Sequence, residues 1–163
     1  GNLRNAVNAV KTAGSPSSFI GIDSSGNSAV FRTTGNDACH LILRGGSSGP
    51  NYYEEDVEDA EKLMQEAGTI PSIMVDCSHA NSRKRIQKQK RVLKSVIEQI
   101  AYGSRSLCGF MLESYLKEGR QDIPDDPVVK MEYGLSITDS CIGWEETESI
   151  VMNAYEMLSE GQH

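Results

Sequence analysis

The sequence lacks several features that would assign it at once to a structural class. It has no closely spaced cysteine pair, no stretch resembling a secretory signal peptide and no run of about eighteen apolar residues. We therefore expect neither a disulfide framework nor a transmembrane helix, and we place the chain in the reducing cytoplasm. The scattered thiols are expected to be small buried side chains: Cys39, Cys77, Cys108 and Cys141.

Positive charge and aromatic residues are also scarce. The formal net charge is −7 and aromatic residues make up 6% of the chain. Nucleic acids and anionic membranes are bound through a basic field, so we expect neither as a partner of the whole chain. One basic run, from Arg83 to Lys94, has no interleaved aromatic residues, and we interpret it as a solvated helix face.

Three apolar runs each end in a polar, chemically useful residue. The central one, Ser72 to Asn81, has the unbroken apolar character of a buried parallel strand and leads to His79. The other two runs lead to Arg44 and Glu113. The intervals between the three residues are nearly equal and match the ~30 or more residues of one strand-helix unit. We therefore expect these side chains on one rim of a parallel sheet.

The remaining periodicity predicts an α/β chain interrupted by a hairpin. An opening helix carries Leu3, Val7 and Val10 at helical spacing and ends near Gly14. A glycine-bearing turn, Asp23–Asn27, then separates two short strand-like runs, which predicts a β-hairpin. The other predicted elements are strands 39–43, 73–75 and 108–112 and helices 53–68, 82–101 and 146–160.

Only three strand-helix units are present, which is too few for a closed parallel barrel. Such a barrel requires eight units and usually ~250 residues. The 163 residues, 38% of them hydrophobic, are compatible with one ordinary core. An isolated three-stranded parallel sheet would leave its edges uncovered. Because the chain also begins in a helix with no strand before it, we expect it to be a piece of a longer protein.

Two groups of residues could carry chemistry. His79, Glu113 and Asp139 are the residue types that bind a divalent transition metal, although a capping histidine beside two solvated acids is the alternative. Arg44 precedes Gly45 and Gly46, whose backbone N–H groups could approach an anion, although a surface arginine before a glycine turn is equally simple. Together the two sites would suit a phosphorylated substrate with a polarised carbonyl.

Longer motifs go beyond these spacings, and they closely resemble the carboxyl-terminal part of class I 3-deoxy-D-arabino-heptulosonate 7-phosphate (DAHP) synthases. The resemblance covers essentially the whole chain, in order. The motifs that carry it are Leu41-Ile-Leu-Arg44-Gly-Gly, Pro50-Asn51-Tyr52, Asp76-Cys-Ser-His79-Ala-Asn81, Met111-Leu-Glu113-Ser114, Glu118-Gly119-x-Gln121 and Tyr133-Gly-x-Ser-Ile-Thr-Asp139-x-Cys-Ile-Gly-Trp144-Glu145.

The resemblance implies a metal-dependent transferase with a (β/α)8 TIM barrel, acting at the first step of the shikimate pathway. Such enzymes condense phosphoenolpyruvate with erythrose 4-phosphate to give DAHP and phosphate, and the intact enzyme is expected to be a homo-oligomer. Their divalent metal (Mn, Fe, Co or Zn) is held by Cys, His, Glu and Asp. His79, Glu113 and Asp139 match the last three, and Arg44 matches the arginine that binds the phosphoenolpyruvate phosphate.

The departures from the family pattern define the expected state of this chain. The metal-binding cysteine belongs to the first strand, and none of the four cysteines here occupies its motif; the Lys-Pro-Arg-Thr-type sugar-phosphate segment is also missing. We therefore expect residues 1–163 to form a partial TIM-barrel domain, about strands 6–8 with an inserted β-hairpin, and to be inactive alone. The alternatives are a non-catalytic metal- or sugar-phosphate-binding half-barrel, a partner domain that completes a barrel with a separate chain, and self-association through exposed strand edges.

Overall fold

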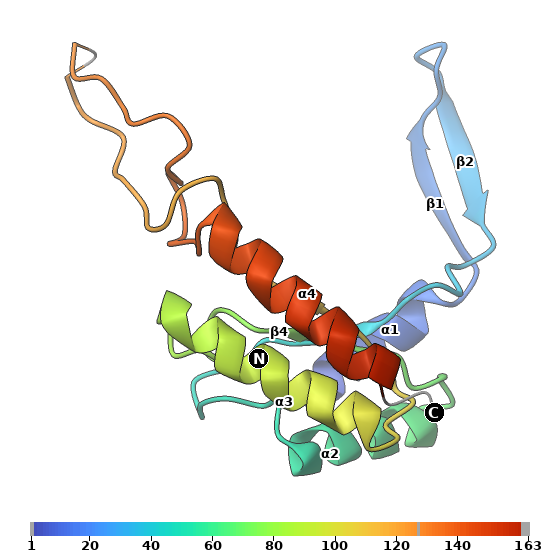
Figure 1. The fold of residues 1–163 in the computed structure, drawn as a ribbon. Coiled ribbons are helices and arrows are strands. Elements are labelled where there is room, and N and C mark those ends of the chain that lie inside the picture. The colour runs from blue at the N-terminus through green and yellow to red at the C-terminus, as the bar shows by residue number, and fades with distance from the viewer. Residues whose placement is uncertain (1, 127, 161–163) are drawn as a thin grey trace.

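A computed structural model describes residues 2–126 and 128–160 and shows a mixed α/β fold (Figure 1). A three-stranded sheet and four helices form the body, and a two-stranded hairpin projects from it. In chain order the elements are α1 (Leu3–Ala13), β1 (Ser17–Ile22), β2 (Ser28–Thr33), β3 (Leu41–Leu43), α2 (Glu54–Glu66), β4 (Ile73–Asp76), a 3₁₀ turn (Ile86–Lys88), α3 (Gln89–Ala101), β5 (Leu107–Met111) and α4 (Trp144–Glu160).

The three strands of the main sheet are parallel and adjacent in chain order. Leu41–Leu43 of β3 pairs with Ile73–Val75 of β4, and β4 pairs with β5 on its other side. The register shifts between Ile73 and Met74, so β5 carries one unpaired residue there. Neighbouring parallel strands finish at the same edge of a sheet, so the prediction of successive strands with a shared rim is confirmed.

All four helices lie on one side of this sheet or on each other. α1 packs on α2 and β3, α2 on β4, and α3 on β5 and α4. The contact faces are apolar and include Leu3, Val7 and Val10, the predicted stripe of α1, and burying such faces is the main favourable contribution to folding. In the described part of the chain, no helix combines the length and apolarity needed to cross a bilayer. The fully buried core residues include Leu43, Val57, Ala60, Met64, Ile73, Val75, Val96, Ile97 and Ile142.

The other side of the sheet is open. Ile42, opposite Met74 in the register, keeps 43% of its surface exposed. Met74 in turn pairs with Gly109 on the same face. Parallel sheets normally bury both faces, because each strand is apolar on both sides. Residues 2–126 and 128–160 therefore provide only one of the two layers that such a sheet requires.

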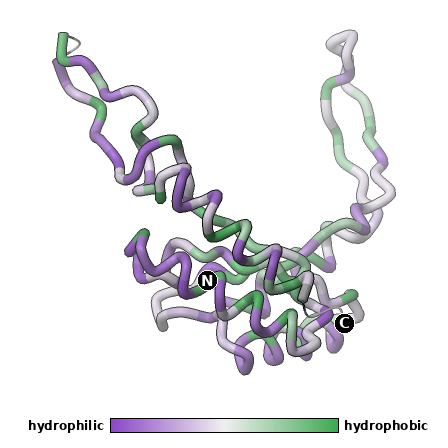
Figure 2. Tube along the Cα trace, in the orientation of Figure 1, coloured by the Kyte–Doolittle hydropathy of each residue, from purple (hydrophilic) through white to green (hydrophobic). Residues whose placement is uncertain are grey.

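The predicted hairpin is confirmed and stands away from the body (Figure 1). Asp23 closes its turn by accepting the N–H groups of Ser25 and Asn27 at 2.9 Å, and the hydrogen bond from Asn27 is the main reason that the pKa of Asp23 is lowered. Across the strands, Phe19 and Phe31 stack with their ring centroids 5.4 Å apart. Hydrophobic stretches lie along both of its strands (Figure 2), and Phe19, Ile20, Ile22 and Val30 are exposed.

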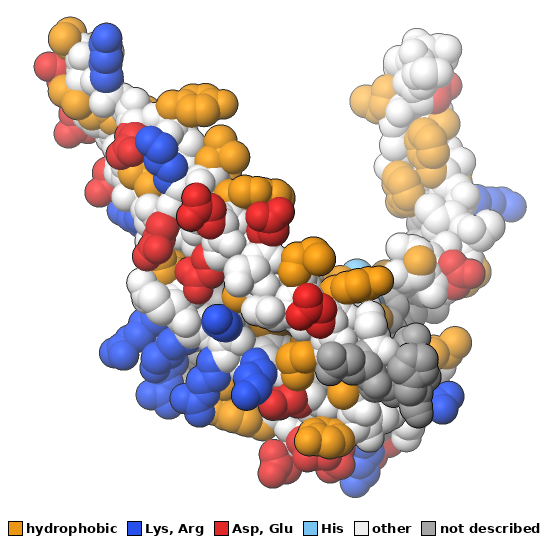
Figure 3. Space-filling model, in the orientation of Figure 1, with side chains coloured by type: hydrophobic (Ala, Val, Ile, Leu, Met, Phe, Trp, Pro, Cys, Tyr) orange, Lys and Arg blue, Asp and Glu red, His pale blue; other side chains and the backbone are white. Residues whose placement is uncertain are grey.

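One predicted helix begins later than expected. Helix α3 starts at Gln89 rather than Ser82, because Arg83 and Lys84 have φ of 54° and 56°, values that a right-handed helix cannot contain. The basic run is therefore divided between this loop and the first half of α3. The prediction that its side chains are solvated is confirmed: Arg83, Lys84, Arg85, Lys90, Arg91 and Lys94 are exposed, and Figure 3 shows the basic patch over α3.

The expectation of buried thiols is correct for two of the four cysteines. Cys77 and Cys141 are buried, and burial raises the pKa of Cys77 to about 12. Cys39 is half-buried and Cys108 is exposed, so the prediction is wrong for Cys108. The reason is the register shift: Cys108 falls between the residues of β5 that pair with Ile73 and Met74. All four cysteines are free thiols.

Candidate metal centre

Three side chains that the sequence singles out meet at the carboxyl edge of the sheet. His79 lies in the loop after β4, Glu113 lies two residues beyond β5, and Asp139 comes from the long segment before α4. The Nε2 atom of His79 is 3.9 Å from Oε1 of Glu113 and 3.8 Å from Oδ2 of Asp139. One ligand atom from each residue falls within 4.8 Å of the others.

This donor set fits a divalent transition metal. One imidazole nitrogen and two carboxylate oxygens are common ligands of such ions. Metal–ligand bonds of ~2.1 Å place tetrahedral ligands about 3.4 Å apart, so the imidazole of His79 lies within about half an ångström of that separation from each carboxylate. Exposure increases from His79 to Asp139, whose side chain is 68% exposed, so an ion would be reached from the Asp139 side.

Backbone pairing beyond β5 places Asp139 and Glu113 together. The N–H of Ile142 donates to the carbonyl of Glu113 at 2.9 Å, and the N–H of Tyr115 donates to the carbonyl of Ile142 at 3.0 Å. The hydroxyls of Ser114 and Thr147, 2.6 Å apart, link this pairing to the first turns of α4. The segment after Asp139 therefore behaves as a short extra strand beside the end of β5.

Gln89 fixes the backbone of Glu113, a role that no pattern in the sequence predicts. It is fully buried at the start of α3. Its Nε2 donates to the carbonyl of Glu113 at 3.1 Å, and its Oε1 accepts the N–H of Glu113 at 2.8 Å. The side-chain amide thus pairs with Glu113 as a neighbouring peptide group would, which holds the residue at the sheet edge.

A second buried amide joins the loops that carry Arg44 and His79. Nδ2 of Asn81 donates to the carbonyls of Leu43 and Asp76, at 3.0 and 2.8 Å. Oδ1 of Asn81 accepts the N–H of Asn51 at 2.8 Å, and Oδ1 of Asn51 accepts the N–H of Gly45 at 2.6 Å. Both asparagines lie in motifs that the sequence singles out, but only the structure gives them this function.

Arg44 and His79 line the same cavity, of about 540 Å³, together with Lys84 and Asn51. The two loops approach closely here: Gly45 has φ of 72°, and a side chain on it would come within 2.7 Å of the Cβ of Ala80. The glycine N–H groups are occupied, since Gly46 donates to the carbonyl of Gly49 at 2.9 Å. In this arrangement an anion in the cavity would meet the side chains of Arg44 and Lys84 rather than these amides.

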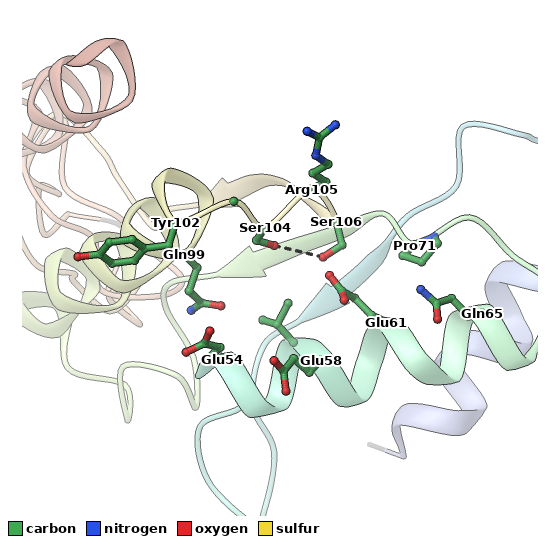
Figure 4. Close-up of a pocket in the computed structure, with 12 residues that line it drawn as sticks. Glu54, Glu58, Glu61, Gln65, Pro71, Gln99, Tyr102, Ser104, Arg105 and Ser106 are labelled. Carbon is green, nitrogen blue, oxygen red and sulfur yellow. Dashed lines mark hydrogen bonds between the residues drawn. The ribbon is translucent and has the colours of Figure 1, made fainter. Parts of the chain in front are cut away.

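A separate hollow of about 510 Å³ lies between α2 and the turn that leads into β5 (Figure 4). Glu54, Glu58 and Glu61 of α2 face Ser104 and Ser106 across it, and these serine hydroxyls are 3.5 Å apart. Acidic side chains on an exposed helix are ordinary, and among the described residues that line this hollow there is neither His nor Cys. The chemistry-bearing groups therefore gather at the other site.

The fold and the site define a class: a parallel α/β protein with a candidate metal centre and a basic pocket at the carboxyl ends of its strands, where barrel and open-sheet proteins bind ligands. The sequence profile of the DAHP synthetase I family matches residues 1–152. The chain belongs to this family.

Individual relatives agree with this assignment. The chain is similar to the Tyr-sensitive phospho-2-dehydro-3-deoxyheptonate aldolase of Salmonella typhimurium, with 45% identity over 98% of this chain and 44% of the relative. It is 47% identical to the aldolase of Haemophilus influenzae over 93% of this chain and 41% of the relative. The solved aldolase from Francisella tularensis superposes with a TM-score of 0.91 and 40% identity, over 100% of this chain and 47% of that structure. The chain thus spans less than half the length of these proteins.

Replacing Gln89 by methionine should remove both hydrogen bonds that hold the backbone of Glu113. Met has a similar volume but cannot bond to the N–H of Glu113, and a buried unpaired amide costs about 1–3 kcal/mol. We expect the free energy of unfolding, measured by urea denaturation, to fall by this amount and Mn²⁺ affinity, measured by calorimetry, to fall with it. Gln87→Met, on the exposed turn just before, should change neither. Equal effects of the two substitutions would contradict the role of Gln89.

Proposed function

We propose that this chain is the carboxyl-terminal part, about strands 6–8, of a (β/α)8 DAHP synthase barrel. Its residues would serve the condensation of phosphoenolpyruvate with erythrose 4-phosphate to DAHP and phosphate. The observation that carries the proposal is the convergence of His79, Glu113 and Asp139 at one edge of the sheet, in a chain of the DAHP synthetase I family.

Each residue has a role that follows from its position. His79 Nε2 and the carboxylates of Glu113 and Asp139 would hold a divalent ion, Mn, Fe, Co or Zn. When bound, such an ion polarises a carbonyl oxygen, here that of the sugar-phosphate aldehyde. Arg44 shares a cavity with His79, and its planar guanidinium suits bidentate binding of the phosphate of phosphoenolpyruvate. Lys84 lines the same cavity and adds positive charge.

We infer that residues 1–163 act as one partial barrel domain that cannot turn over alone. Three metal ligands come from this chain, but the fourth that the family resemblance implies, a cysteine, has no counterpart among its four cysteines. The cavity beside Arg44 borders β3, the edge strand of the sheet. A substrate placed there would meet water where a barrel would supply further strands, and electrostatic stabilisation by the protein is weaker in water.

The metal site can be tested on the chain itself. After incubation with Mn²⁺ or Zn²⁺ and desalting, elemental analysis should find one ion bound per chain, held by the three converging ligands. His79→Ala should reduce the metal content to background, whereas His40→Ala, which changes a histidine outside the site, should leave it unchanged. If His79→Ala retained metal at the wild-type level, the proposed metal centre would be wrong.

Because the proposed site is only part of an active site, we expect no turnover by the isolated chain. With phosphoenolpyruvate, erythrose 4-phosphate and Mn²⁺, this chain should release no phosphate above the enzyme-free rate. A full-length family member under the same conditions serves as the positive control. Turnover by the isolated chain comparable to that control would show that these residues suffice, and the inference of a partial site would be wrong.

A second candidate function, a non-catalytic half-barrel that joins another chain or a second copy of itself, is favoured by the open face of the sheet. Ile42 is exposed there and β3 has a free edge within the described residues. Apolar faces and free strand edges associate readily in water. We expect light scattering to give a mass above that of one chain, decreasing on dilution. A monomer at all concentrations would exclude self-association.

A further inference from the structure

Asp76, the last residue of β4, lies directly behind His79. Its side chain is only 4% exposed, and its Oδ2 is 2.7 Å from Nδ1 of His79. The other oxygen, Oδ1, accepts the N–H of Ser78 at 2.8 Å. A carboxylate held by a backbone N–H in a short turn has little freedom to rotate. It is therefore a fixed negative group on the side of the imidazole that faces away from Glu113 and Asp139.

The Nδ1 atom of His79 is unusual within residues 2–126 and 128–160. It is the one fully buried side-chain nitrogen or oxygen there without a regular hydrogen bond. The distance to Oδ2 of Asp76 is short, so the contact fails as a hydrogen bond because it is bent. A buried polar atom left unpaired is costly. A rotation of the ring that directs an Nδ1–H at Asp76 would remove that cost.

The backbone of His79 is held in place, so rotation of the imidazole ring is the main movement left to this residue. His79 has φ of 45°, a conformation that few residues other than glycine adopt. Its carbonyl accepts the N–H of Lys84 at 2.7 Å and the hydroxyl of Ser82 at 3.3 Å. The backbone therefore sets where the imidazole stands, while the group beside Nδ1 decides which nitrogen carries the proton and where Nε2 points.

We propose that Asp76 is a positioning residue for His79, an inference that rests on the proposed metal centre. As a carboxylate it can only accept a hydrogen bond, so it keeps the imidazole proton on Nδ1 and leaves the lone pair of Nε2 facing Glu113 and Asp139. Histidines that bind metals commonly donate their second N–H to such a group, which fixes the tautomer and raises the basicity of the ligand.

The first test is metal affinity in the isolated chain, with Co²⁺ as an optical probe. Asp76→Asn keeps the size of the side chain and an oxygen for the N–H of Ser78, but removes the charge. We expect the Kd for Co²⁺ to rise by about 10- to 100-fold. Ser78→Ala, which retains the backbone N–H that Asp76 binds, is the matched control and should leave the Kd unchanged. An unchanged Kd in Asp76→Asn would overturn the proposal.

The second test needs no metal and separates positioning from folding. Long-range ¹H–¹⁵N spectra of metal-free protein, at a pH where histidine is neutral, report which ring nitrogen carries the proton. We expect the Nδ1–H form of His79 in the wild type and a mixture of tautomers in Asp76→Asn, with both proteins unfolding at similar temperatures. The Nε2–H form in the wild type would contradict the role of Asp76. If instead the wild type has the Nδ1–H form but binds no Co²⁺, the proposed metal centre fails while the positioning contact stands.

Discussion

The parallel register of β3, β4 and β5 is the constraint on which the site depends. Leu43, Val75 and Phe110 lie side by side in the register, so the three strands end close to one another at the same edge of the sheet. The polar residues that follow then emerge together at one edge. A slip of one residue would exchange the two faces of a strand and move Val75 from the helix-covered core to the open side. The hydrophobic pattern of the strands therefore fixes the geometry of the site indirectly.

Beyond the last strand residues, two buried side-chain amides supply the hydrogen bonds that a neighbouring strand would otherwise provide. Asn81 donates hydrogen bonds to the carbonyls of Leu43 and Asp76. Gln89 bonds to both the backbone N–H and the backbone carbonyl of Glu113. Loops lack the regular partners that strands provide, so a buried loop must find its hydrogen bonds elsewhere. Each amide supplies a donor and an acceptor, as a peptide group does. The loops that follow β3 and β4 and the backbone of Glu113 are in this way tied to their surroundings by buried hydrogen bonds.

The sequence predicts the scaffold better than the supports of the site. Apolar runs and near-equal spacing indicate the strands and their common rim, and residue type indicates His79 as a candidate ligand. The late start of α3 could not be foreseen, because Arg83 and Lys84 are good helix formers, yet their N–H groups bond to the carbonyls of Ala80 and His79 in a left-handed turn. Gln89 is equally hidden, since a glutamine within a basic run is normally expected at the surface, and its partner is a backbone group distant in sequence.

The two candidate sites differ in how much of their surroundings the described residues provide. The candidate ligands His79, Glu113 and Asp139 come from the segments that follow β4 and β5 and from one that pairs with the end of β5, so these three are brought together by this chain alone. The Arg44 cavity instead adjoins β3, whose outer edge is unpaired in residues 2–126 and 128–160. Helix α1 covers β3 but cannot supply strand hydrogen bonds. The candidate metal centre therefore depends on contacts within these loops, whereas the Arg44 cavity is bounded by an unpaired strand edge.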